Sequence, residues 1–323
     1  MSSVRLLVCA LAIMAAICSA QTTPQPSPPR PDPLMTQIRK SVAFLKLTCK
    51  DGDKEIEDRG TGFFVGFPDP RLPKDQSFPY LVTNRHVALC WKDFGKPLPV
   101  ENISITLNRR QPNGDVVAQE VFLNRSGNAA WVFPQDESVD LAVLPFGPDP
   151  AEFDFLTAPF TMLAGDDFLA EKRITEGQPI FFVGFFYQFR GTKRIEPIVR
   201  QGIIAMLPHE KVAFKNLSER VYLADAHVFG GNSGSPVFFN LGGYHEGALF
   251  GGDDYRLLGV INAEIFEDNN FNLEVTAMLQ GSVQANSGVS TIVPAFELKA
   301  LLCDPRLQEL RNQAVNARGT QQR

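Results

Sequence analysis

Apolar residues occur along this chain in short runs rich in β-branched and aromatic side chains, separated by polar segments with Gly, Pro, Asn and Asp. Six such runs precede residue 150, at 41–49, 61–66, 80–84, 103–108, 116–123 and 141–145. Six more follow a loop over 147–159, at 179–186, 198–207, 220–224, 236–239, 257–263 and 290–293. Short strands at this spacing are typical of all-β barrels and sandwiches. We therefore predict an all-β protein of two six-stranded antiparallel β-barrels, over residues 37–150 and 151–302.

Helical periodicity is convincing only near the C-terminus. Pro294 stands where a helix favours proline, in its first turn, and Phe296, Leu298 and Leu301 can form one buried stripe. This pattern predicts a terminal helix that ends near residue 302. Residues 303–323 form a polar tail, which we expect to lack stable structure.

The first 36 residues are expected to lie outside the fold. Residues 1–20 combine an early positive charge, an apolar run over 6–17 and small residues up to Ala20, the pattern of a cleaved secretory signal. The apolar run is shorter than the roughly 20 residues that span a bilayer. A lipoprotein signal at Cys18 is the weaker interpretation. Residues 21–36 are a Pro-rich leader, expected to be extended. The mature chain has no other candidate span, so we expect a secreted or periplasmic protein.

Composition excludes several functions without defining one. The net charge of −5 is spread along the chain and forms no basic stripe, which argues against nucleic acid as a partner. No His, Cys and Asp residues have metal-ligand spacing, and no glycine-rich phosphate loop follows a strand. We therefore expect neither a metal nor a cofactor. The oligomeric state is not specified by the sequence.

Three segments carry residues that together suggest catalysis. His86 stands at the end of the apolar run 81–87, and Asp140 begins the apolar run 140–145. Ser233 lies in the turn Gly230-Gly231-Asn232-Ser233-Gly234-Ser235-Pro236. The chain order His, Asp, Ser is that of chymotrypsin-type enzymes and differs from the subtilisin and α/β-hydrolase orders. The separations of 54 and 93 residues allow each residue to lie on a different loop.

In this interpretation Ser233 is the nucleophile, His86 the general base and Asp140 the carboxylate that orients the base. The backbone N–H groups of Gly231 and Ser233 are the candidate oxyanion hole. Each residue taken alone also has an ordinary interpretation, as a packed histidine, a solvated carboxylate or a turn serine. Their conjunction, in order, favours catalysis. Ser235 precedes a proline, and a structural role suits it better than that of nucleophile.

With these segments the chain resembles the trypsin-like serine peptidases, over residues 40–302. The segment 230–238 is most similar to glutamyl endopeptidases, whereas 140–144 and 197–204 are at least as similar to HtrA-type proteases. The polar tail is too short for a PDZ domain, so the HtrA arrangement with appended PDZ modules is not expected. The resemblance implies two barrels with an active site between them, and hydrolysis of peptide or protein substrates through an acyl-enzyme without a cofactor.

The resemblance also suggests a substrate pocket and a mode of activation. It places the pocket walls at 226–230 and 259–264, with His227 and Asn262 as candidate pocket residues. Glutamyl endopeptidases have a histidine near the position of Asn262, so a preference for glutamate is weakened. His227 either reads a polar or acidic side chain or caps a turn. Members activated by a newly cut N-terminus have an aspartate before the serine; Asn232 there argues against that route.

The mature chain keeps three cysteines, Cys49, Cys90 and Cys303. In trypsin-like peptidases a disulfide commonly joins the strand region before the histidine to the turn after it. The resemblance therefore favours Cys49–Cys90, and three buried free thiols are the alternative.

Two other functions remain open at this stage. A non-catalytic binding module on the same fold would need a blocked cleft, and Phe229 or the insertion 242–254 could obstruct it. An exported esterase would use the same chemistry on esters. An exported serine endopeptidase is the function that the sequence favours.

Overall fold

The computed structural model describes residues 32–91, 97–124, 130–189, 191–214, 217–245, 248–250, 254–274 and 278–321. The chain divides into a unit of residues 1–32 and a unit of residues 33–323. The expected signal over 1–20, and the leader as far as residue 31, lie outside the described residues. The account below concerns the second unit.

The first half of this unit is a β-sheet in the hydrogen-bonded order β5-β4-β1-β2-β3-β6, with the short β7 pairing in parallel with β2. Its long strands have runs of consecutive buried residues, such as 60–66 of β2 and 42–45 of β1, which indicates that these parts of the sheet are covered on both faces. Leu45, Phe64 and Ile105 from three neighbouring strands are fully or almost fully buried. The strands are β1 (Val42–Asp51), β2 (Lys54–Phe67), β3 (Phe78–Thr83), β4 (Val100–Arg110), β5 (Val116–Asn124), β6 (Ala142–Pro145) and β7 (Ala158–Pro159).

The second half contains a closed barrel, in the order β12-β17-β16-β13-β8-β9. Its interior is filled by apolar side chains such as Phe182, Val237 and Ile261, all fully buried. The barrel strands are β8 (Pro179–Gly184), β9 (Ile198–Met206), β12 (Tyr222–Asp225), β13 (Pro236–Asn240), β16 (Tyr255–Glu274) and β17 (Met278–Pro294). Two small hairpins accompany it: β10 (Val212–Phe214) with β11 (Leu217–Glu219), and β14 (Gly243–His245) with β15 (Ala248–Phe250).

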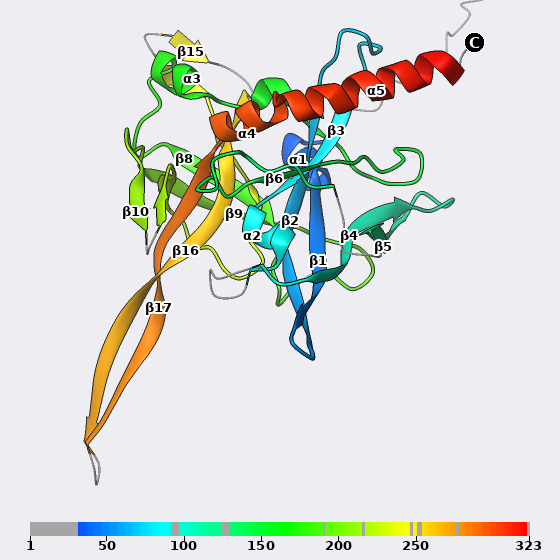
Figure 1. Ribbon diagram of the computed structural model, residues 1–323. Helices are drawn as coiled ribbons and strands as arrows, with labels where there is room; N and C mark the ends of the chain where they lie inside the picture. The colour runs from blue at the N-terminus through cyan, green and yellow to red at the C-terminus, as the bar shows by residue number, and fades with distance from the viewer. Residues whose placement is uncertain are drawn as a thin grey trace, which may run out of the picture. The chain divides into compact units, whose positions relative to one another are not determined.

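Each of the twelve runs predicted from the sequence coincides with a strand, and the all-β fold is confirmed (Figure 1). The barrel of the second half closes as expected. In the first half, the end strands β5 and β6 are not paired with each other within the described residues, so the sheet does not close into a barrel there. Strands β16 and β17 pair far beyond the barrel, from Gly259 opposite Pro294 to Glu274 opposite Met278, and their outer part extends away from the other strands (Figure 1).

The described helices are short, apart from the last one. They are α1 (Leu34–Lys40), α2 (Arg85–Leu89), the 3-10 turn η1 (Phe160–Met162), α3 (Asp166–Glu171), α4 (Ala295–Leu302) and α5 (Pro305–Gln321). Helix α4 is the predicted terminal helix, and Pro294 precedes it as its N-cap. None of the helices described has the length and apolar character needed to cross a membrane.

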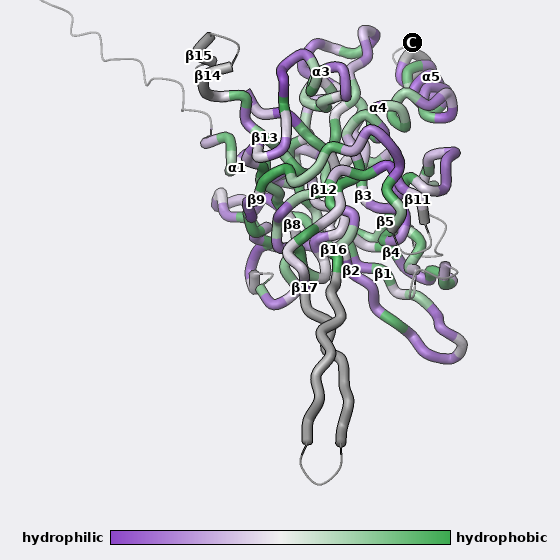
Figure 2. Tube along the Cα trace, turned by 90° about the vertical axis from the view of Figure 1, so that its left-hand side faces the viewer, coloured by the Kyte–Doolittle hydropathy of each residue, from purple (hydrophilic) through white to green (hydrophobic). Residues whose placement is uncertain are grey.

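The expectation of an unstructured tail over 303–323 is wrong, because α5 occupies most of it. The helix is largely hydrophilic (Figure 2), so its sequence lacks the broad apolar stripe that signals a packed helix. Two residues dock it instead. Leu307 is fully buried, and the buried Arg311 donates hydrogen bonds to the Tyr80 hydroxyl at 2.9 Å and the Leu302 carbonyl at 3.0 Å. The Arg311 guanidinium also lies 4.0 Å from the centre of the Phe67 ring.

Apolar side chains from both halves form one continuous core cluster. It includes Val42 and Phe63 of the first half and Val183 and Phe238 of the second. Phe44 and Phe185 meet across the interface, with ring centres 4.5 Å apart in an edge-on arrangement. Such aromatic pairs stabilise an interface beyond the area that they bury. The two halves are therefore packed against each other where β1 and β2 meet the segment that follows β8.

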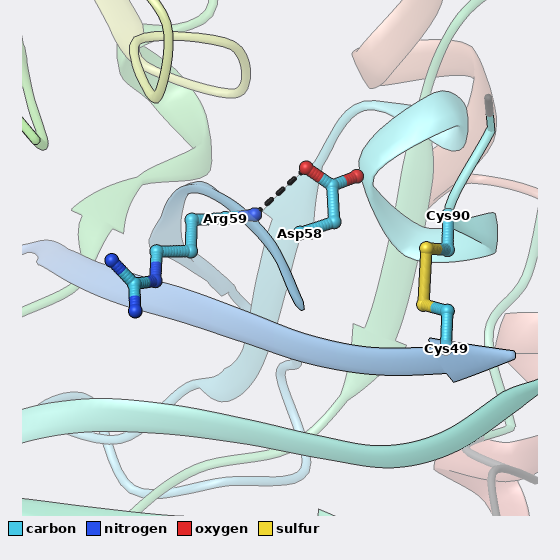
Figure 3. Close-up of a disulfide and its surroundings, with 4 residues drawn as sticks. All are labelled: Cys49, Asp58, Arg59 and Cys90. Atoms are coloured by element: carbon cyan, nitrogen blue, oxygen red, sulfur yellow. Dashed lines mark hydrogen bonds between the residues drawn. A yellow bond between two sulfur atoms is a disulfide. The ribbon is translucent and has the colours of Figure 1, made fainter. Parts of the chain in front are cut away.

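The predicted disulfide is confirmed: Cys49 of β1 is bonded to Cys90, directly after α2 (Figure 3). Cys303 is a free, exposed thiol.

Candidate active site

His86 is positioned by the short helix α2, which begins as soon as β3 ends. Arg85, Val87 and Ala88 of this helix are buried, so the helix is held firmly against the sheet. The chain leaves it through Cys90, whose φ of 54° ends the helix in the left-handed conformation. Since Cys90 is also tied to β1 by the disulfide, both the start and the end of the segment that carries His86 are fixed.

Asp140 binds His86 through two separate hydrogen bonds. Asp140 Oδ2 lies 2.5 Å from His86 Nδ1, and Asp140 Oδ1 accepts the backbone N–H of His86 at 2.9 Å. The side chain of Asn84 adds a third link by donating to the Asp140 carbonyl at 2.9 Å. Because an ionised carboxylate only accepts, Nδ1 carries the ring hydrogen and Nε2 is left as an acceptor. The sequence-predicted base and its orienting carboxylate are thus brought together.

Opposing influences act on the His86 ring. Its burial is the largest and lowers the pKa, but the charge and hydrogen bond of Asp140, helped by the charges of Asp58 and Glu219, raise the pKa above the ordinary value of 6.5. The side chain of His86 keeps 23% of its surface exposed and that of Asp140 keeps 15%. A substrate can therefore reach the ring, although its surroundings are poorly solvated.

Ser233 lies in a turn whose backbone requires glycine on both sides. Gly231 has φ 93° and Gly234 has φ 88°, conformations that disfavour other residues. A Cβ added at Gly234 would lie less than 2 Å from the Thr61 carbonyl oxygen, so no side chain fits there. Thr61 fixes the turn from β2 of the first half. Its N–H donates to the Ser233 carbonyl at 2.8 Å, and its hydroxyl donates to the Gly231 carbonyl at 2.7 Å.

The Ser233 hydroxyl is not bonded to His86 in this structure. It donates to the backbone carbonyl of Asn262 on β16, at 3.1 Å. His86 Nε2, for its part, has no hydrogen-bond partner among the described residues. The structure thus joins two of the three predicted catalytic residues directly.

Asn232, the neutral residue before the serine, is fully buried and uses both ends of its amide. Its Nδ2 donates to the Phe185 carbonyl at 2.5 Å, and its Oδ1 accepts the Phe229 N–H at 2.9 Å. Its own N–H donates to the Phe229 carbonyl at 2.9 Å. The turn is therefore held by amide hydrogen bonds within the second half, and no buried charge is needed to hold it.

The backbone N–H groups of Gly231 and Ser233, the candidate oxyanion hole, donate to no acceptor in the described part of the chain. Neighbouring N–H groups are used: that of Gly234 donates to the Ile261 carbonyl at 2.9 Å, and that of Ser235 to the Asn232 carbonyl at 3.0 Å. Ser235 is fully buried, and its hydroxyl has no partner among the described residues. Its position fits the structural role expected for it.

The two candidate pocket residues behave differently. His227 is exposed and lies beside Gly288 of β17: a Cβ added at that glycine would be 3.4 Å from the imidazole ring. Asn262 is buried, and its amide Nδ2 donates to Glu219 Oε2 at 3.1 Å. The Asn262 side chain is thus bonded to Glu219, and its backbone carbonyl accepts the Ser233 hydroxyl.

A cavity of about 520 Å³ lies next to Gly231, between β2 and the second half. It is lined by the aromatic residues Phe186, Tyr187 and Phe229 and by the charged residues Glu57, Asp58 and Arg59, besides neighbouring residues. The Asp58 carboxylate accepts the Arg59 N–H at 2.8 Å and is turned toward α2, whereas the Arg59 guanidinium points the other way (Figure 3). Burial raises the pKa of Asp58, although the Arg59 N–H and the charge of His86 act against the rise.

Sequence reasoning missed several of these residues. Thr61 falls in a strand, and its hydrogen bonds to the serine turn involve partners 170 positions away. Glu219 and Asp58 belong to polar segments that look solvated in the sequence. The strand pattern gave one usable signal: Gly60-Thr61-Gly62 places small residues directly before the apolar run Phe63-Phe64-Val65, and glycine within a strand often marks a close approach of another backbone.

The solved structures described below share less than a fifth of their residues with this chain. No curated protein matches the chain. Among solved structures, the HtrA-type protease AlgW with a decapeptide is similar with 18% identity and a TM-score of 0.44, over 81% of this chain and 62% of that one. The chain thus spans less than two thirds of the length of that relative. The MamO protease domain from Magnetospirillum magneticum, in its apo form, is similar with 16% identity and a TM-score of 0.44, over 84% of this chain and all of that one.

The family assignment comes from the sequence itself. The profile of the trypsin-like peptidase domain matches residues 60–244, which is more than half of the chain. The matched segment begins beside Thr61 and contains His86, Asp140 and Ser233. This chain belongs to the trypsin-like peptidase domain family.

Proposed function

We propose that this protein is an exported serine endopeptidase that hydrolyses peptide bonds through an acyl-enzyme. The observation that carries the proposal is the pair of hydrogen bonds between Asp140 and the Nδ1 and backbone N–H of His86, which leaves Nε2 as an acceptor. This is the tautomer that a general base needs. The neighbouring N–H groups of Gly231 and Ser233, without acceptors in the described part, supply the matching electrostatic site.

In the proposed reaction, the Ser233 hydroxyl leaves the Asn262 carbonyl and turns to His86. His86 Nε2 takes the hydroxyl proton as Oγ forms a bond to the substrate carbonyl carbon. The negative charge that develops on the carbonyl oxygen is held by the N–H groups of Gly231 and Ser233. The protonated His86, stabilised by Asp140, then gives its proton to the leaving amine as the C–N bond breaks. A water molecule repeats the sequence on the acyl-enzyme and frees Ser233.

Substrate residues close to the scissile bond would occupy the cavity beside Gly231. Its aromatic residues favour apolar contacts. His227 remains our candidate residue for the pocket that accepts the substrate residue before the scissile bond. Its exposed ring beside Gly288 is compatible with reading a polar or acidic side chain.

Export is supported by the Cys49–Cys90 disulfide, since such bonds persist in oxidising compartments. A secreted or periplasmic location is therefore part of the proposal. Reduction would loosen the segment that follows His86, so the active form is expected outside reducing compartments.

The test is labelling with a fluorophosphonate probe, which reacts only with an activated serine. The parent protein should be labelled, and Ser233→Ala and His86→Ala should abolish the label. Ser235→Ala is the matched control, because that hydroxyl is two residues away and buried, and it should leave labelling intact. Loss of the label in Ser235→Ala but not in Ser233→Ala would show that Ser235, and not Ser233, is the nucleophile.

A non-catalytic binding module is the second candidate, favoured by one observation. The Ser233 hydroxyl is bonded to Asn262 rather than His86, as it would be in a site that never turns over. Phe229 is 40% exposed and held by the Phe186 ring and the Arg200 guanidinium beside the cavity. A folded parent that binds peptides but takes up no probe would support this candidate. Faster turnover of ester than of peptide substrates would point to an esterase instead.

A further inference from the structure

Glu219 is a buried carboxylate that the proposed reaction does not use. It ends strand β11 of the small hairpin β10–β11 and keeps only 7% of its surface exposed. Burial and the nearby negative charge of Asp140 raise its pKa, while the hydrogen bond from Asn262 and the charge of His86 lower it. Burying a carboxylate near a second carboxylate lowers the stability of the fold. Such an arrangement therefore suggests a functional role for Glu219.

Two hydrogen bonds connect Glu219 to Ser233 through Asn262. Glu219 Oε2 accepts the Asn262 side-chain N–H at 3.1 Å, and the Asn262 backbone carbonyl accepts the Ser233 hydroxyl at 3.1 Å. Asn262 stands at a β-bulge: Ile261 pairs with Ile292 and Ala263 with Thr291, so Asn262 has no partner in β17. A bulge re-aims the residue that it carries and needs its own support. Here the support is the carboxylate of Glu219.

Glu219 also contributes to the charge around His86. The carboxylates that act on the His86 ring are Asp140, Asp58 and Glu219, each from a different segment. The adjacent Arg220 is not a counter-charge for Glu219 in this structure, since its guanidinium pairs with Asp166 at 2.6 Å. An ionised Glu219 therefore adds net negative charge beside the base, which favours the protonated imidazole.

We infer that Glu219 is a positioning residue of the site: its hydrogen bond to Asn262 holds the β16 bulge that receives the Ser233 hydroxyl. The inference rests on the proposed function for its catalytic meaning. It adds a residue to the three of the proposed triad. Neither Glu219 nor Asn262, which lie 43 residues apart in the sequence, takes part in the proposed bond changes.

Two variants separate the two roles of Glu219. Glu219→Gln keeps an oxygen for the Asn262 amide but removes the charge. Glu219→Ala removes both and leaves the Asn262 amide buried without a partner. Asp58→Asn is the matched control, because Asp58 also acts on His86 by its charge but is not bonded to Asn262.

The first readout is the pKa of the His86 ring, followed by NMR titration against a His86→Gln reference spectrum. Glu219→Gln and Asp58→Asn should each lower this pKa by a few tenths to about one unit, the size expected of one nearby charge at a protein surface. This measurement does not need turnover. An unchanged pKa in Glu219→Gln would mean that the Glu219 carboxylate does not act on His86 and would overturn the inference, whatever Asp58→Asn shows.

The second readout is the rate of fluorophosphonate labelling at a pH where His86 is fully neutral. Glu219→Ala should label at least about tenfold more slowly, because an unsupported bulge misplaces Ser233, whereas Glu219→Gln should stay within about threefold of the parent. Equal rates in Glu219→Ala and the parent would also overturn the inference. If the parent is not labelled at all, the proposed function fails, and the titration still decides the role of Glu219.

Discussion

The amide of Asn232 offers the sharpest test of how the serine turn is held. In Asn232→Asp, the introduced carboxylate would face the Phe185 carbonyl at the place where Nδ2 now donates at 2.5 Å. The side chain is fully buried, and its hydrogen bonds in the structure are to backbone groups, so no cation compensates the new charge. The carboxyl can restore the lost donor only by staying protonated. Its folded-state pKa should therefore rise well above the ordinary value of about 3.9.

The magnitude follows from the protonation that folding then requires. Holding such a group neutral costs about 1.4 kcal/mol for each pH unit above 3.9, which is about 4 kcal/mol at pH 7 and about 1.5 kcal/mol at pH 5. The folded pKa is raised, so the penalty on stability grows as pH rises and fades as pH falls. Urea unfolding of the parent and of Asn232→Asp at both pH values measures the difference.

Asn232→Ala is the control for this experiment, because it loses both side-chain hydrogen bonds without adding a charge. Its loss of stability should be about 1–3 kcal/mol and should not change between pH 5 and pH 7. The reasoning fails if Asn232→Asp is as stable as the parent at pH 7, or if its loss is the same at both pH values. Either result would mean that a cation or solvent reaches the introduced group.

Three further predictions concern the site and its frame. The acid limb of the kcat/KM profile should have its midpoint above pH 6.5, because the raised pKa of His86 delays formation of the neutral base; a midpoint below that value would contradict the assignment. Gly234→Ala should abolish probe labelling, because its Cβ would overlap the Thr61 carbonyl, and a labelled, folded variant would refute the geometry. The pair Cys49→Ser and Cys90→Ser should each lower the free energy of unfolding by about 4 kcal/mol, the loop-closure value for a separation of 41 residues, as measured by urea unfolding under non-reducing conditions.

The strands were predictable because their signal is local. A run such as Leu81-Val82-Thr83 shows its burial and its β-propensity in the residues themselves, and the flanking turn residues mark its ends. The tail was not predictable for the opposite reason. Helix α5 is held by Leu307 and Arg311, and an arginine gives no sign in the sequence that it will be buried against aromatic rings.

The same distinction applies to the site. His86, Asp140 and Ser233 could be proposed because each stands in a short segment with a recognisable local pattern. The orientation of the Ser233 hydroxyl could not, because it depends on a bulge at Asn262 and on a carboxylate in a separate hairpin. Pairings between distant segments arise from tertiary packing, and a single sequence carries no trace of them.

The contacts of Thr61 would make the proposed activity depend on how the two halves of the fold pack together. This one residue of the first half binds the carbonyls of both Gly231 and Ser233, and its hydroxyl also accepts the Phe185 N–H at 2.9 Å. If the halves separate by about an ångström, the hydrogen bonds from Thr61 to the serine turn are broken while every strand can remain paired within its own half. The proposed catalytic activity would then be lost before the circular dichroism signal of the β-strands changes. A ligand or partner that separates the two halves would therefore abolish the proposed activity without unfolding the protein.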